Sequence, residues 1–394
     1  MRKLCLENGL SPSIIRSLYE YGKKRKAEVG EENVFDFSIG NPSSPTPDCV
    51  NEKLVELLKD AATNRVHLYT SNAGDTQVRK AIADYLNKTY GADTDGSLIF
   101  MSCGAAASLS VTINALINPG DEVIIFAPHF PDYRVFSEFA GATVKVVKPD
   151  YQTFQPDFAD FLDKLSPKTR LVIIDSPNNP SGVMYTKETI ERLASILSEK
   201  ETAYDHPIYL LSDEPYRELI YDGQPYPFPL NFYDDSIVAY SFSKSWSLPG
   251  ERIGYIVANK KCLDANNVFA AINGSARSLG YVCAPSLFQK MIPSCLGVTA
   301  DLSLYKRNRD LLYRSLTELG YEAIYPQGAF YMLLKCLEED SLVFSEKAKS
   351  LDLLLVPTDA FGLKGYVRIS YCVDTDVIER SLPAFKRLKE MYGR

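Results

Sequence analysis

The feature that most constrains the fold is an alternation of short apolar runs with longer helix-like stretches over some 150 residues. Each run has the length of a buried strand and is bounded by turn or polar residues. The strand predictions are 98–101, 122–126, 143–147, 171–174, 208–212, 237–241 and 254–257, and the helix predictions between them are 105–117, 133–139, 157–165 and 187–199. This alternation predicts an α/β fold with a mostly parallel central sheet flanked by helices. Ligands of such sheets bind at the carboxyl ends of the strands.

The chain of 394 residues is too long for one hydrophobic core, so two domains are expected. The pattern changes after about residue 285 into a smaller α+β domain. Its predicted elements are a helical stretch over 285–319 broken near Pro293, strands at 330–334 and 366–370, and helices at 345–349 and 374–390. An amphipathic helix at 11–21 has no place in the central sheet. The predicted division is therefore an N-terminal segment (1–39) packing with the small domain, a large domain (40–290) and a small domain (291–394).

Composition excludes several classes of function. The net charge of −7 argues against binding nucleic acid or an anionic membrane surface. No apolar run approaches the roughly 20 residues that span a bilayer, and the N-terminus does not resemble a secretory signal, so a cytoplasmic location is expected. With eight cysteines in no CxxC pair and three scattered histidines, reduced thiols are expected and neither a zinc site nor a histidine-based triad is.

Polar residues follow three of the predicted strands at their carboxyl ends. Asn179 lies in an Asn-Asn-Pro-Ser-Gly turn, which turn chemistry alone would explain. Asp213 begins Asp-Glu-Pro-Tyr and would either cap a helix or hold a proton on a cationic ring nitrogen. Lys244 ends Ser-Phe-Ser-Lys; a lysine there is usually a solvated charge, but its amine is also the group that condenses with an aldehyde.

A candidate anion site accompanies these residues. Ser241, Ser243 and Arg252 offer hydroxyls and a guanidinium suited to a phosphate dianion. The small residues of 103–108 open a helix after the strand at 98–101, where free backbone N–H groups attract anions. An alanine-rich helix start is common, so this second signal is weak by itself.

The combination resembles the class I/II aminotransferases, which are pyridoxal-phosphate (PLP) enzymes of fold type I, and the resemblance is closest to aspartate aminotransferases. It rests on the order of the motifs from Gly40 to Arg368: Gly-Ala-Ala, Asn-Pro-Ser-Gly, Asp-x-x-Tyr, Ser-x-Ser-Lys with an arginine eight residues on, and a late Val-Arg-Ile-Ser. The resemblance covers nearly the whole chain and implies PLP as cofactor.

The resemblance also implies roles around the cofactor ring. Lys244 would carry PLP as a Schiff base and then move a proton as general base and acid. Asp213 would pair with the ring nitrogen, and Asn179 and Tyr216 would bond to the phenolic oxygen. Phe130 occupies the place of an aromatic ring stacked on the cofactor, although a plain core phenylalanine would look the same.

At the phosphate, the resemblance implies backbone contacts from Gly104, Ala105 and Ala106 and side-chain contacts from Ser241, Ser243 and Arg252. Tyr69 matches a tyrosine that reaches the phosphate in the partner subunit. That role requires a homodimer with shared active sites, and two-fold dimers are the commonest oligomers. A half-buried surface tyrosine is the alternative.

For the substrate, Arg368 resembles the arginine that clamps the α-carboxylate by a two-pronged contact. Gly40 matches the glycine beside that carboxylate, and Asn179 would lie at the same place. The chain departs from many relatives in carrying Asn41 where they have glutamate. Arg277 lies near the place of a distal-carboxylate arginine, but its neighbourhood matches poorly and a surface charge is the simpler interpretation.

The function predicted from this resemblance is PLP-dependent amino-group transfer between an L-amino acid, with aspartate favoured, and a 2-oxo acid. A C–S β-lyase or a decarboxylase with the same cofactor stays open, because fold does not decide which bond breaks. A binding protein without turnover is the third possibility, and the complete set of cofactor residues argues against it.

Overall fold

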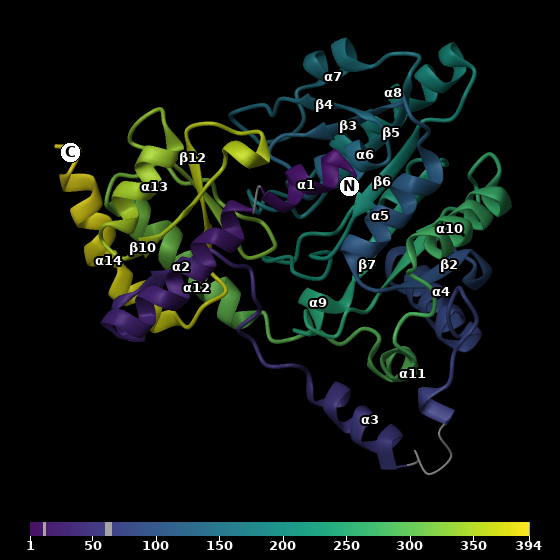
Figure 1. The fold of residues 1–394 in the computed structure, drawn as a ribbon, viewed down its shortest axis with the longest axis horizontal. Helices are drawn as coiled ribbons and strands as arrows, with labels where there is room; N and C mark the ends of the chain where they lie inside the picture. The colour runs from purple at the N-terminus through teal and green to yellow at the C-terminus, as the bar shows by residue number, and fades with distance from the viewer. Residues whose placement is uncertain (11–12, 60–64, 394) are drawn as a thin grey trace.

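A computed structural model describes residues 1–10, 13–59 and 65–393 of the chain. Figure 1 shows a large part built on a twisted sheet and a smaller part in which both the N-terminal helix α2 (Ile14–Val29) and the C-terminal helix α14 (Thr375–Glu390) lie. Helix α3 (Asp48–Lys59) extends along the edge of the large part, and α1 (Lys3–Leu10) precedes α2. No helix of the described ranges is long and apolar enough to cross a membrane.

The large part contains the predicted central sheet. Its seven strands have the order β2-β8-β7-β6-β5-β3-β4. They are β2 (Ile99–Ser102), β3 (Glu122–Phe126), β4 (Thr143–Val147), β5 (Thr169–Asp175), β6 (Tyr209–Asp213), β7 (Ser236–Ser241) and β8 (Gly254–Ala258). Strand β8 is antiparallel to both neighbours, and the other pairs are parallel. The mostly parallel α/β sheet predicted from the sequence is confirmed.

Helices cover both faces of this sheet. One face packs against α5 (Ala105–Leu116), α6 (Asp132–Phe139) and α10 (Ala265–Leu279), and the other against α4 (Thr76–Tyr90), α7 (Phe158–Lys164), α8 (Lys187–Tyr204) and α11 (Ser286–Cys295). Alternate residues of a strand face opposite layers. On β5, Leu171 and Ile173 therefore lie in the α5 layer, whereas Val172 and Ile174 lie against α8.

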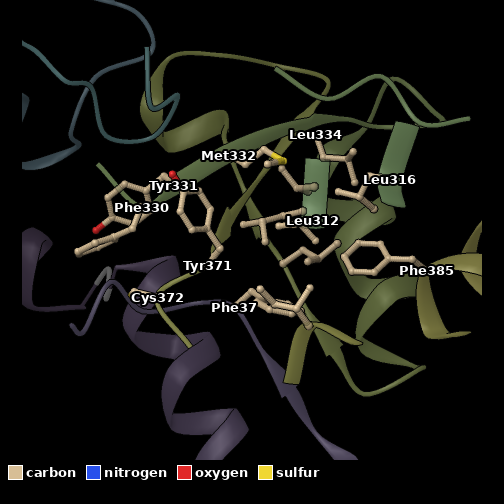
Figure 2. Close-up of a cluster of buried hydrophobic side chains, with 14 of the residues drawn as sticks. Phe37, Leu312, Leu316, Phe330, Tyr331, Met332, Leu334, Tyr371, Cys372 and Phe385 are labelled. Carbon is tan, nitrogen blue, oxygen red and sulfur yellow. The ribbon is translucent and has the colours of Figure 1, made fainter. Parts of the chain in front are cut away.

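The smaller part has its own sheet and core. The strands β11 (Val356–Pro357), β12 (Tyr366–Ser370) and β9 (Tyr331–Lys335) are antiparallel and pack with α12 (Ser303–Glu318), α13 (Ser341–Lys349) and α14. Figure 2 shows Leu312, Leu316 and Phe385 meeting Phe37 in this core. These buried side chains come from both ends of the chain.

The N-terminal segment lies against the smaller part. Strand β1 (Phe35–Asp36) pairs in parallel with β10 (Leu353–Leu354), and Leu18 of α2 packs on Val356 and Phe361. The predicted start of the α2 helix at residue 11 lies outside the described residues. The domain bounds 1–39, 40–290 and 291–394 stay a prediction.

The predicted break of the helical stretch near Pro293 is confirmed, since the chain leaves helical geometry between Cys295 and Ser303. Helix α11 contains Pro293 and continues to Cys295 before the chain leaves helical geometry. Gly297 follows with φ of 84°, a left-handed conformation that glycine adopts without steric cost. The glycine therefore marks the interruption, and α12 begins at Ser303.

Candidate active site

The carboxyl ends of β5, β6 and β7 open into a cavity of about 260 Å³ at the meeting of the two parts. Most of the predicted site residues line it: Gly40, Ala105, Ala106, Phe130, Asn179, Asp213, Tyr216, Ser241, Ser243, Lys244, Arg252 and Arg368. They come from the central sheet, the start of α5, the N-terminal segment and β12. Residues separated by more than 300 positions thus meet in one place.

Lys244 lies in the wall of this cavity on α9 (Phe242–Ser245), the short helix that follows β7. Its Nζ donates a hydrogen bond of 2.7 Å to the carbonyl oxygen of Gly40. Burial lowers the pKa of Lys244 to about 8, and the guanidinium groups of Arg252 and Arg368 act in the same direction. An amine with this pKa is partly neutral near neutral pH, which is the form that acts as a nucleophile or base.

Asp213 is the last residue of β6 and faces the cavity. Its Oδ2 accepts a 2.6 Å hydrogen bond from the hydroxyl of Tyr133, whereas its buried Oδ1 has no hydrogen-bond partner within residues 1–10, 13–59 and 65–393. Burial raises the pKa of this carboxyl to about 7. No ion pair involves Asp213 among the described residues, so the site leaves a buried acid open to a cationic group.

A small anion pocket lies where α5 begins. The Ser241 Oγ and Ser243 Oγ are 2.7 Å apart, and Ser241 Oγ also accepts from the Ser243 N–H, which fixes both hydroxyls. Gly104 precedes α5 with φ of 85°, and a Cβ built there would lie 2.8 Å from Nη2 of Arg252. The guanidinium therefore passes directly over the helix N-terminus, where free N–H groups favour anions.

Arg368 brings the C-terminal part to the same cavity. It lies on β12, is 1% exposed, and donates a 3.0 Å hydrogen bond from Nη1 to Oδ1 of Asn179. Its Nη2 donates to the carbonyl oxygen of Ser38, and its buried Nε has no hydrogen-bond partner in the part of the chain that the structure describes. Burial lowers the pKa of Arg368, but an arginine stays charged at any physiological pH. The two parts of the molecule thus meet through one buried cation.

Tyr216 and Gly40 meet around a residue that the sequence did not single out. The hydroxyl of Tyr331, at the start of β9, lies 2.9 Å from that of Tyr216. A Cβ at Gly40 would collide with the same hydroxyl, so only glycine fits beside it. Figure 2 shows Tyr331 at the edge of the small core, next to Phe330. A tyrosine starting a buried strand carries no signal of a site in the sequence.

Two further residues at the site also escaped prediction, one behind the cavity wall and one in it. Tyr133 follows Phe130 by three positions on the α6 side, packs edge-on against it at 5.7 Å between ring centroids, and donates to Asp213. Asp175 ends β5 and lines the cavity, although the sequence had marked only the turn after it. Its place at a strand's carboxyl end was the signal that could have found it.

Two predicted residues do not reach this cavity within one chain. Tyr69 is 94% exposed, and Arg277 is exposed on α10; neither lines the cavity. Gly104 does not line it either but abuts Arg252, as described above. Tyr69 and Arg277 could contribute to an active site only in another copy of the chain.

Comparisons with known proteins agree with this geometry. The family model described as aminotransferase class I and II matches residues 32–385. A probable aspartate aminotransferase of Methanocaldococcus jannaschii is 31% identical over 97% of this chain and 98% of its own. These matches extend over both parts of the molecule, as the motifs did.

Solved structures lead to the same family. An amino transferase from Eubacterium rectale has 50% sequence identity and a TM-score of 0.98, covering 100% of this chain and 99% of its own. The aspartate aminotransferase of Thermotoga maritima has 27% identity and a TM-score of 0.86, covering 99% and 100%. The chain belongs to the class I and II aminotransferases and is an enzyme of that family, with the fold that the sequence predicted.

Proposed function

We propose that this aminotransferase binds PLP through Lys244 and moves an amino group between aspartate and a 2-oxo acid, working as a homodimer. The observation that carries the proposal is that Asp213, a buried acid with no ion-pair partner among the described residues, lines the same cavity as Lys244, an amine whose pKa is lowered. The anion pocket of Arg252, Ser241 and Ser243 lines that cavity too.

The residues present fit PLP in charge and in hydrogen bonding. The unpartnered Oδ1 of Asp213 is a suitable acceptor for a protonated ring nitrogen. Ser241, Ser243, Arg252 and the backbone at the start of α5 suit a phosphate dianion. Phe130 would cover one face of the ring. When bound, PLP supplies an aldehyde for the amine and an electron sink for the carbon acid.

Lys244 performs the proton transfer in this proposal. With PLP bound, the neutral Nζ of Lys244 would accept the proton from the substrate Cα as a base and would then donate it, as an acid, to the carbon that carried the cofactor's aldehyde. The pKa of about 8 suits both directions near neutral pH. The Tyr331 hydroxyl holds that of Tyr216, and Arg368 holds the side-chain oxygen of Asn179. Both polar groups therefore keep their orientation at the cavity wall.

Arg368 would bind the substrate α-carboxylate. Its Nη1 and Nη2 are held by Asn179 and Ser38, and the remaining Nε–H is unused. Because Arg368 and Gly40 lie outside the central sheet, substrate binding would draw the smaller part onto the large one and exclude water. Exclusion of water strengthens the charge contacts inside the site.

The preference for aspartate rests on relatives. The proteins from M. jannaschii and T. maritima carry aspartate aminotransferase in their names. The cavity offers Arg368 for one carboxylate, and Arg277 would have to read the second from another subunit. Exposed Tyr69 and its neighbour Leu68, which is 59% exposed, support a dimer interface there.

The test is a half-reaction monitored by the cofactor spectrum. Purified protein with PLP should absorb as a yellow Schiff base and convert to the amine form with aspartate faster than with alanine or an aromatic amino acid. Lys244→Ala should abolish this conversion, and the control Lys187→Ala, at an exposed lysine of α8 that lies 3.4 Å from Glu191, should preserve it. Wild-type protein that takes up no PLP would refute the proposal. Release of pyruvate and ammonia without the amine form would indicate a lyase instead.

A further inference from the structure

Two buried carboxyl groups lie side by side at the floor of the cavity. Asp175 and Asp213 are register partners on the parallel strands β5 and β6. Adjacent strands are only about 4.8 Å apart, and register partners project to the same face. Both residues continue the rows that face α5 and α6, following Ile173 and Leu211. Each is 5% exposed, and both line the cavity.

Both acids keep an unused oxygen. Asp175 Oδ2 accepts from the Asn179 N–H at 2.9 Å and lies 3.4 Å from Nδ2 of Asn178, while its Oδ1 has no partner. Asp213 has the same arrangement, with Oδ2 bonded to Tyr133 and Oδ1 free. In the described part of the chain, neither acid forms an ion pair. Buried carboxylates are otherwise almost always paired.

In the described part of the chain, four phenols lie around the pair together with the carboxyl of Glu214, which helps raise the pKa of Asp213. The charge of Asp175 contributes to the raised pKa values of Tyr133 on α6 and of Tyr185, Tyr216 and Tyr331. Two adjacent carboxylates cannot both ionise at low cost in such a place. Burial and the neighbouring acid raise the pKa of Asp175 well above its usual range. The raised pKa values of both acids favour a proton held on the pair over two ionised carboxylates.

We propose that Asp175 is a second carboxyl partner for the cofactor ring nitrogen, sharing one proton with Asp213 and able to take its place. This inference rests on the proposed PLP site. When the ring nitrogen is unprotonated on entry, the carboxyl O–H bond breaks and an N–H bond forms, so the proton moves and the total charge is unchanged. The ring is then held as a cation over two carboxyl groups instead of one.

A purely structural role for Asp175 makes a different prediction. Its Oδ2 orders the turn that carries Asn179, and asparagine would keep that acceptor. Asp175→Asn removes the charge and preserves the turn. If Asp175 only holds the turn, the substitution changes nothing at the cofactor; if it faces the ring nitrogen, the substitution lowers the nitrogen's pKa.

The experiment uses enzyme reconstituted with PLP labelled with ¹⁵N in the ring, and compares Asp213→Asn with the double variant D175N/D213N. We measure the ring-nitrogen pKa by NMR and PLP affinity by absorbance titration. In D213N, Asp175 should keep the nitrogen protonated at neutral pH. In the double variant the pKa should fall by about one unit or more, because an opposite charge within contact distance shifts a pKa by roughly 1–3 units. PLP affinity should fall about tenfold with it.

A matched control is Asp235→Asn in the D213N background. Asp235 is another buried acid, bonded to the Leu263 N–H at 3.0 Å outside the cavity, and its loss should leave both readouts unchanged. Should D175N/D213N not fold, Asp175→Ser in the same background gives the same comparison with a smaller acceptor. Equal nitrogen pKa and equal affinity in D213N and the double variant would overturn the inference. Failure of wild-type protein to take up PLP would instead refute the proposed function.

Discussion

Gly104→Ala tests whether the start of α5 and Arg252 form the phosphate pocket. Gly104 has φ of 85° and ψ of 172°, a region that is essentially restricted to glycine, so alanine costs about 1–3 kcal/mol of stability. The new Cβ would also lie 2.8 Å from Nη2 of Arg252. Since that atom ends a flexible side chain, the guanidinium moves away and the fold survives.

The displaced guanidinium should weaken cofactor binding by a predictable amount. Losing one hydrogen bond to a charged group costs about 1.5–3 kcal/mol. At 1.4 kcal/mol for each factor of ten, PLP binding should become roughly 10–100-fold weaker. The affinity is measured by absorbance titration of the apo-enzyme, and stability by urea unfolding of the same sample.

Gly120→Ala is the matched control for this prediction. Gly120 also has a positive φ, 97°, but a Cβ there meets nothing within 4 Å. It should lose stability by a similar backbone effect and bind PLP as the wild type does. Equal PLP affinity in wild type and both variants would refute the assignment of the phosphate pocket.

Three further predictions concern other parts of the site. Arg368→Lys should raise the KM for the amino acid about 10–100-fold in steady-state kinetics, with PLP affinity unchanged, because a two-pronged contact with the carboxylate is lost. The control is Arg309→Lys, at a buried arginine that pairs with Asp222, and it should affect stability alone. Asp213 has a folded pKa of about 7 against 3.8, so its contribution to apo-enzyme stability is present below pH 4 and lost as pH rises to 7. Urea unfolding should show the free energy of unfolding of wild type falling relative to that of Asp213→Asn over that window, and a constant difference would contradict the burial argument. Tyr69→Phe should lower PLP affinity several-fold without dissociating the dimer, as measured by titration and sedimentation; unchanged affinity would remove Tyr69 from the site.

The sequence predicted the elements that depend on local pattern. Strand-length apolar runs bounded by turns were sufficient for the central sheet, and the rule of carboxyl ends placed Asp213 and Lys244 in one cavity. Helix α13 begins four residues earlier than predicted because Asp340 caps it by accepting from Leu342 and Val343. The polar cap lies outside the apolar pattern from which the helix was inferred.

The parts that escaped prediction depend on contacts between distant segments. Tyr331 contributes to the site only because β9 brings it against Tyr216, 115 residues away, and Gly40. Asp175 becomes significant only through the register between β5 and β6. Strand register and the packing of one part on another cannot be read from residue type or spacing in a single sequence.

The charges that line the cavity favour a ligand that carries both signs of charge. Arg252 and Arg368 both lower the pKa of Lys244, while Asp175 and Asp213 lie side by side and form no ion pair within the described residues. Like charges are thus grouped by the fold instead of being paired. A zwitterionic ligand with an anionic tail and a cationic ring would pair with the cations and with the two carboxyl groups at once. Binding would thereby reduce the repulsion within each group, and this reduction would add to the affinity. Ligand that binds only the folded state also stabilises it by mass action. Saturating PLP should therefore raise the midpoint of urea unfolding in wild type more than in D175N/D213N, where part of that repulsion is already gone.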